Sequence, residues 1–174
     1  MAWRKDASNR VNRRGWGRRR RRTVVAAVTW SLIFVLFVQS AGVHAALPTG
    51  GEIQAGAGAI VQHGENLLAI EQESDKLIVH WDSFSIGSDK QVVFVQPGAS
   101  AVALNRVLGV SPSLIDGALR ANGQVFLVNP YGVVFGKDAI VDVGGLVAST
   151  LSVSDDDFAA GLYRFTGGDG AGEV

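Results

Sequence analysis

The residues of this chain that could carry chemistry are few. Cysteine is absent, which excludes disulfides, cysteine-ligated zinc and thiol nucleophiles. One of the three histidines lies near the N-terminus, and the other two, His63 and His80, have no histidine partner at metal-ligand spacing. For these two we expect a local hydrogen bond or solvent exposure. The sequence therefore predicts no metal site and no cofactor.

Acidic residues are the remaining candidates for catalysis or calcium binding. The run 155–157 is three aspartates, whose hard oxygens suit calcium, but three consecutive acids in a strand cannot all face one ion, and we expect a solvated loop. Polysaccharide-cleaving β-helices cluster acidic and basic side chains on one face. Here the acids are dispersed, and we find no arginine or lysine recurring with them at coil spacing: Asp82, Asp89, Asp116 and Asp142. We predict that the chain is not an enzyme.

Two asparagines follow apolar runs at a separation of 24 residues. Asn105 follows AVAL and Asn129 follows VFLV, a spacing that suits one coil of a β-solenoid. Asn129, Pro130, Tyr131 and Gly132 predict a type I turn, because proline presets φ, asparagine can bond the backbone and glycine is favoured at the fourth position. The turn is either purely structural or, through a projecting Tyr131, a contact for a partner.

The pair Asn105-Arg106 has the same two interpretations. Arg106 is one of six basic residues after position 45, where acidic residues number fifteen. We therefore expect its local partner to be a carboxylate. Trp81 and Phe84 lie in an alternating pattern that indicates core packing rather than ligand stacking.

The net charge of zero hides two opposite segments. Residues 1–45 hold ten basic residues and one acid, giving +9, and residues 46–174 are at −9. The first segment has a basic stretch, an uncharged apolar run from 23 to 38, and small residues before a cut between Ala45 and Ala46. This pattern predicts a secretory signal peptide with a long basic first region, handled by the general secretory translocon.

Three other interpretations of the leader are weaker. Nucleic-acid binding by the arginine run is disfavoured because an apolar segment and an acidic domain follow it, and we predict no nucleic-acid partner. An uncleaved membrane anchor needs about 20 apolar residues, more than this run supplies. Twin-arginine export is disfavoured by the residues that follow the arginines.

The remainder predicts one domain over residues 46–165, and residues 166–174 are a glycine-rich start of a further region or a truncated end. Period-two and continuous apolar runs dominate this domain, separated by turns that contain glycine or asparagine. One short helical turn is expected over 111–120, with Ser111 as N-cap and Pro112 at the first helical position. The expected strands are 52–55, 59–62, 66–72, 77–81, 91–96, 101–107, 124–128, 133–136, 139–143 and 146–150.

Short strands of uneven length with few hairpin signals suit an antiparallel sandwich or barrel, or a β-solenoid, and favour the solenoid slightly. Four segments then carry a resemblance: IVHWDSFSIG (78–87), VVFVQPGASAVALNRVLG (92–109), GALRANGQVFLVNPYGVVFGKDA (117–139) and VDVGGLVAST (141–150). Together they resemble the N-terminal secretion (TPS) domain of filamentous haemagglutinin-like exoproteins, the passengers of two-partner secretion.

The resemblance implies an all-β fold, a right-handed parallel β-helix with short extra strands. It also implies export to the surface of a diderm bacterium via the periplasm, through an outer-membrane β-barrel transporter with POTRA domains. The family's Asn-Pro-Asn-Gly motif appears as Asn129-Pro130-Tyr131-Gly132, and the place of Asn-Pro-Asn-Leu is taken by Asn105-Arg106-Val107-Leu108. These positions are therefore the secretion-motif candidates.

Two functions from different classes remain. The first is a secretion-targeting domain of a surface adhesin, which nucleates β-helix folding outside the cell and whose longer passenger would meet receptors on host or neighbouring cells. The second is a self-contained extracellular β-helix that binds or cleaves glycans.

Overall fold

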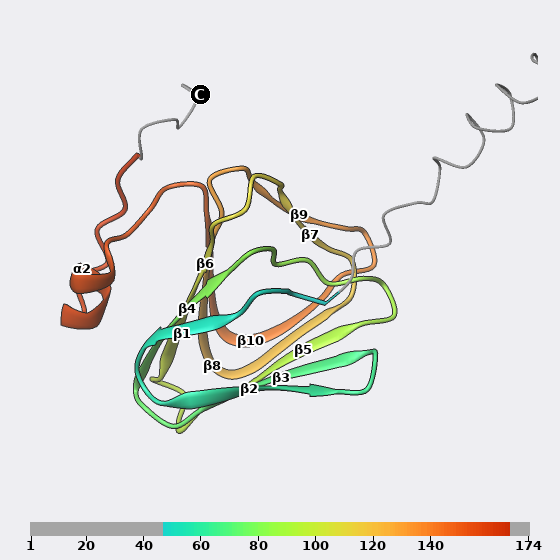
Figure 1. The fold of residues 1–174 in the computed structure, drawn as a ribbon, viewed down its shortest axis with the longest axis horizontal. Helices are drawn as coiled ribbons and strands as arrows, with labels where there is room; N and C mark the ends of the chain where they lie inside the picture. The colour runs from blue at the N-terminus through green and yellow to red at the C-terminus, as the bar shows by residue number, and fades with distance from the viewer. Residues whose placement is uncertain (1–46, 168–174) are drawn as a thin grey trace, which may run out of the picture. The chain divides into compact units, whose positions relative to one another are not determined.

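The computed structural model describes residues 47–167, and the predicted signal peptide, its cleavage position and most of 166–174 lie outside them. Within this range the regular secondary structure is β-strand apart from one short helix (Figure 1). The elements are β1 (Glu52–Ala55), β2 (Gly58–His63), β3 (Leu67–Gln72), β4 (Lys76–Trp81), β5 (Gln91–Val95), β6 (Val102–Val107), β7 (Ser113–Ile115), β8 (Ala118–Val128), β9 (Val133–Phe135), β10 (Ile140–Ser149) and α2 (Asp155–Ala160).

The strands stack in parallel into a solenoid with three faces. The first face stacks β3, β5 and the first halves of β8 and β10, and the second stacks β4, β6 and the second halves of β8 and β10. The third face pairs β7 with β9 and bridges Ile86 to Ile115. The chain thus makes about four turns, and the predicted parallel β-solenoid is confirmed. Connections between parallel strands of this kind are right-handed in nearly all proteins, which agrees with the predicted right-handed β-helix.

Two antiparallel strands cover the first coil. β1 pairs with β4 on the second face, and β2 pairs with β3 on the first. They are the short extra strands expected from the sequence, and they occupy the edge that the first coil would otherwise leave unpaired. At the other end of the solenoid, β10 pairs with β8 along one edge. No strand among the described residues pairs with its other edge.

Inward-facing side chains form the core as ladders of aligned residues. Leu77, Val79 and Trp81 point inward along β4, as the period-two pattern predicts, and all three are buried. Trp81 meets Phe84 edge to face, with ring centroids 5.5 Å apart, so the predicted core role of both aromatics is confirmed. The outward side of the second face is also apolar, and residues after β10 cover it.

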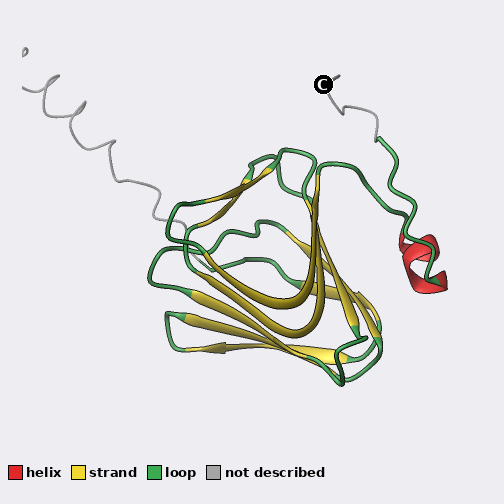
Figure 2. Ribbon diagram, turned by 180° about the vertical axis from the view of Figure 1, so that it is seen from behind, coloured by secondary structure: helices red, strands yellow, loops and turns green. Residues whose placement is uncertain are grey.

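At the corner between the first and second faces, β8 and β10 continue without a break as single bent strands (Figure 2). The Asn122 side chain bonds the backbone N and O of Gln96 in the preceding coil, both at 2.7 Å. A Cβ on Gly123 would lie 2.7 Å from the Ala101 carbonyl oxygen. The residues that look like a turn in the sequence therefore remain in strand register, and the strand predicted over 124–128 begins at Ala118.

The helical turn expected over 111–120 is wrong. Residues 113–115 form β7, and β8 starts at Ala118. The backbone groups here bond across coils instead of along a helix: Ile86 N donates to Leu114 O and Asp116 N to Ile86 O, both at 2.8 Å. Gly117 completes the corner, because a Cβ there would lie 2.1 Å from Gly87 O. Stacking on the previous coil overrides the local Ser-Pro helix signal.

Residues 155–157, expected to form a solvated loop, instead form the first turn of α2. Ser154 caps this helix, its Oγ accepting from Asp157 N at 3.1 Å, and Phe158 buries one face of it. None of the helices described between residues 47 and 167 is long and apolar enough to cross a membrane.

Candidate functional site

Asn105 lies in the middle of β6, not in a turn, and its side chain is completely buried. Its Oδ1 accepts from Trp81 Nε1 at 3.0 Å, and its Nδ2 donates to the carbonyls of Ala103 and Phe126, both at 3.3 Å. These bonds link three successive coils, because Trp81, Asn105 and Phe126 belong to β4, β6 and β8. In the folded domain, Asn105 therefore satisfies buried polar groups and faces no partner.

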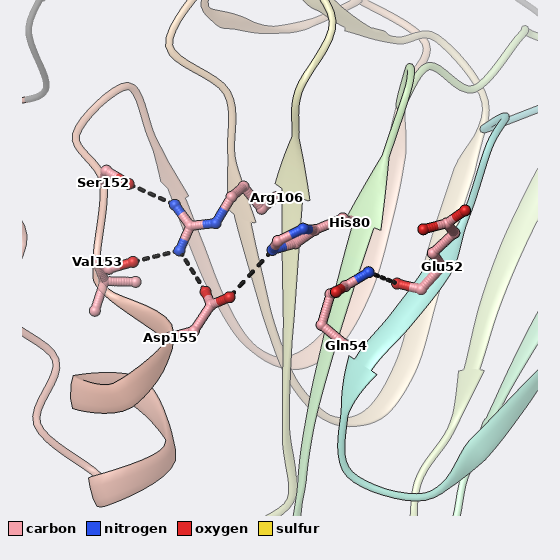
Figure 3. A network of polar contacts seen from close by, with 7 residues as sticks. All are labelled: Glu52, Gln54, His80, Arg106, Ser152, Val153 and Asp155. Carbon is pink, nitrogen blue, oxygen red and sulfur yellow. Dashed lines mark hydrogen bonds and ion pairs between the residues drawn. The ribbon is translucent and has the colours of Figure 1, made fainter.

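Arg106, the next residue, points to the outer side of the second face. Its Nη1 donates to Ser152 Oγ, and its Nη2 donates to Val153 O and, at 2.7 Å, to Asp155 Oδ1 (Figure 3). The guanidinium is mostly buried, with 15% of the side chain exposed. The expected carboxylate partner is confirmed, and it comes from the start of α2. Sequence analysis missed this identity because 49 residues separate the two.

His80 completes this cluster. Its Nε2 lies 3.2 Å from the second oxygen of Asp155, so one carboxylate joins His80 and Arg106 (Figure 3). Glu52 of β1 is aligned with His80 on the other side. His80 thus has a hydrogen bond, but its partner lies 75 residues along the chain and is not the local group that we expected. No group of three potential metal ligands occurs in the part of the chain that the structure describes.

The turn from Asn129 to Gly132 has the predicted hydrogen bonds. Gly132 N donates to Asn129 O at 3.0 Å, Asn129 Oδ1 accepts from Tyr131 N at 2.9 Å, and Gly132 has φ +109°. The Asn129 side chain is buried and its Nδ2 donates to Ser111 O at 3.0 Å and Ser113 Oγ at 2.9 Å. The turn is thus bonded to the preceding coil, while 55% of Tyr131 is exposed.

Asn105 and Asn129 are not equivalent positions of the solenoid. In the register of β6 on β8, Asn105 is aligned with Leu127, an offset of 22 residues instead of 24. Asn105 faces the core within a strand, whereas Asn129 closes the corner after one. Their spacing correctly suggests coils of this length, but not a shared role.

Exposed apolar side chains surround the turn. Leu114 and Val134 are aligned on the third face, and both are exposed. Val110 lies in the loop that bonds the turn, and 75% of it is exposed. We call Val110, Leu114, Tyr131 and Val134 the loop-tip surface. Sequence analysis found only Tyr131, because the strand stacking that brings the others together has no local signal.

The four dispersed aspartates form no catalytic cluster with one another. Asp142 Oδ2 lies 3.2 Å from Arg120 Nη1, and the two residues are aligned in neighbouring coils. The expectation that no basic residue recurs with these acids at coil spacing is therefore wrong for this pair. Both side chains are exposed, and they border a shallow hollow of about 340 Å³ whose wall also includes Val93 and Val95. The pair is a surface ion pair and offers no general acid and base set.

Comparisons with known proteins agree on one family. The sequence model of the TPS secretion domain matches residues 45–174. Two heme/hemopexin-binding proteins of Haemophilus influenzae, one of them from strain ATCC 51907 / DSM 11121 / KW20 / Rd, are 44% and 42% identical over 99 and 104 residues. These matches cover 57% and 60% of this chain and 11% of each relative. The crystal structure of the HMW1 secretion domain from Haemophilus influenzae superimposes with a TM-score of 0.67 and 34% identity, covering 70% of this chain and 32% of that one.

Proposed function

The chain belongs to the TPS secretion domain family, and from this premise we propose how the domain is used. It is the secretion-targeting domain of a two-partner-secreted exoprotein of Gram-negative bacteria. The family is one of secretion domains and not of enzymes. We infer that an outer-membrane β-barrel recognises it through periplasmic POTRA domains, after the general secretory translocon has delivered it to the periplasm. The observation that carries this proposal is the family match over residues 45–174 on a stacked solenoid.

The solenoid suits transport through a pore because its coils are added one after another. Each coil takes its hydrogen bonds from the coil before it, so the chain can cross unfolded and then stack outside. No cysteine is present to lock the chain before it crosses. Folding outside the cell then hinders return and biases transport outward.

The passenger would extend beyond this domain. The matches span only 11% of the length of the curated relatives, whose names describe heme/hemopexin binding. We propose that a longer passenger carries adhesin-like contacts with host or neighbouring cells. The alternative, a self-contained β-helix that binds or cleaves glycans, is not favoured, because the family is one of secretion domains. We propose no nucleic-acid partner, since residues 46–174 carry a net charge of −9.

Charge gives the first test of this partnership. With a net charge of −9, residues 46–174 should meet a basic surface on the transporter. Binding to the purified periplasmic part of the transporter, measured by calorimetry, should weaken roughly three- to tenfold between about 50 and 500 mM NaCl. Affinity that does not change with salt would remove the electrostatic part of the proposal, and no binding at low salt would contradict the partnership.

The loop-tip surface gives the second test. We propose that Tyr131 contacts the transporter, while Asn129, Pro130 and Gly132 hold the turn. Asn105 bonds neighbouring coils to one another, and Arg106 holds residues 152–155. Tyr131→Ala should leave the urea midpoint almost unchanged and weaken transporter binding about tenfold or more, because exposed tyrosines are frequent hot spots.

The matched control for Tyr131→Ala is Val95→Ala. Val95 is exposed to 54% but lies on the first face, away from the turn. Unchanged binding by both variants would contradict the proposal that the transporter contacts Tyr131.

A further inference from the structure

After β10 the chain leaves the solenoid path and returns to where it left. Ser152 and Thr166 pair in an antiparallel bridge, with Ser152 N donating to Thr166 O at 2.9 Å and Thr166 N to Ser152 O at 2.8 Å. The residues between them include α2 and lie on the outside of the second face (Figures 1 and 2). We call residues 152–166 the strap. Its two ends pair with each other, so it is a closed loop whose ends lie side by side.

The strap covers an apolar stripe on the outer side of the second face. Val153 and Phe158 of the strap are fully buried, and Phe165 packs beside them. Phe126 is the centre of the contact, with ring centroids 5.8 Å from Phe158, 5.0 Å from Tyr163 and 6.2 Å from Phe165. The stripe beneath is built by aligned outward residues of three coils: Ile78, Val102, Leu104, Phe126 and Val128.

Polar side chains hold both ends of α2. At its C-terminal end, Lys76 Nζ donates to Ala159 O at 2.7 Å, where a cation also complements the helix dipole. At its N-terminal end, the Asp155 carboxylate is hydrogen-bonded to both Arg106 and His80. Lys76 and His80 lie on the same side of β4, and Arg106 lies on β6 directly beside His80.

These contacts come from several coils at once. Lys76 and His80 come from the first coil, Arg106 from the second, and Phe126 from the third. The surface that the strap contacts is therefore made by residues of different coils, and it is complete only when these coils are stacked. Arg106 donates hydrogen bonds to three groups of the strap, all between residues 152 and 155, so it is the main polar contact of the strap with the coils.

We propose that the strap is a latch that closes after the coils have stacked, opens as a unit without unfolding them, and is positioned by Arg106. Closure covers the apolar stripe and ties the first two coils to the chain that follows the fourth. In secretion it would mark a domain that has fully emerged; that use rests on the proposed function, whereas the latch itself does not. Arg106 is accordingly a positioning residue that acts through Asp155.

Hydrogen exchange read by mass spectrometry on the full chain tests the latch. In Arg106→Ala, amides of the strap should exchange about ten- to a hundredfold faster. The substitution removes a largely buried guanidinium and leaves its three acceptors in the strap without this donor. Amides of β3 and β5, on the other face, should keep their protection. A dye that binds exposed apolar surface should bind more strongly, since the stripe opens.

Two further variants keep the result decisive. Asp155→Asn changes the strap and leaves every coil residue in place, so it should give the same pattern even if Arg106→Ala folds poorly. Arg120→Ala removes the arginine of the exposed Arg120–Asp142 pair and should leave strap exchange unchanged. Unchanged strap protection in Asp155→Asn and Arg106→Ala would overturn the proposal, and so would equal acceleration in the strap and in β3 and β5. Neither outcome depends on any transporter.

Discussion

Replacing Gly117 by alanine should lower the free energy of unfolding by more than about 3 kcal/mol. Gly117 forms the corner between the third and first faces, and a Cβ there would lie 2.1 Å from Gly87 O and 2.3 Å from Lys90 O. Both are backbone atoms of the preceding coil, where Lys90 O also accepts from Ala118 N at 3.0 Å. The coils would have to separate locally, which breaks stacking hydrogen bonds. Urea unfolding followed by circular dichroism measures the effect.

Gly98→Ala is the matched control, because a Cβ at Gly98 meets no atom within 4 Å. Its stability should stay within about 0.5 kcal/mol of the parent, or rise slightly because the unfolded chain loses freedom. If Gly117→Ala were as stable as Gly98→Ala, the coils would not be stacked as closely at this corner as described.

Asn105→Ala should cost about 2–4 kcal/mol of unfolding free energy. It leaves the Trp81 indole N–H and the Phe126 carbonyl without this partner in a fully buried place, and it opens a small cavity between coils. A double-mutant cycle with Trp81→Phe should show coupling, because each change removes the other's partner.

The comparison variant is Asn66→Ala, whose Oδ1 accepts from Lys90 Nζ in an exposed bond. That change should cost less than about 0.5 kcal/mol. An Asn105→Ala protein of normal stability that is no longer secreted would contradict the structural role and make Asn105 a recognition residue.

The strands could largely be predicted from apolar alternation. The pattern of β4 fixes which of its residues face inward, and the glycines near strand ends mark corners. What a local pattern cannot show is the partner of each segment one coil away. Asn122 and Gly123 look like a turn, yet they continue β8 because Asn122 bonds Gln96 of the previous coil. Sequence analysis therefore predicted only the second half of β8, divided β10 into two strands and placed a helix where β7 lies.

The site shows the same division. The turn at Asn129 carries its own geometry, so its hydrogen bonds and the exposed Tyr131 were predictable. The burial of Asn105 was not, because it depends on Trp81 standing over it in the preceding coil. The helix α2 did have a signal: Ser154 three residues before Asp157 is an N-cap pattern, hidden by the acidic run.

Secretion itself tests the central claim most directly. Residues 1–174 should be expressed in a diderm host with and without the outer-membrane β-barrel transporter that is encoded beside the gene for this chain. The medium is then assayed for protein beginning at Ala46. We predict folded β-rich protein in the medium only when the barrel is present. Retention as a folded β-rich protein in the periplasm under both conditions would contradict the account.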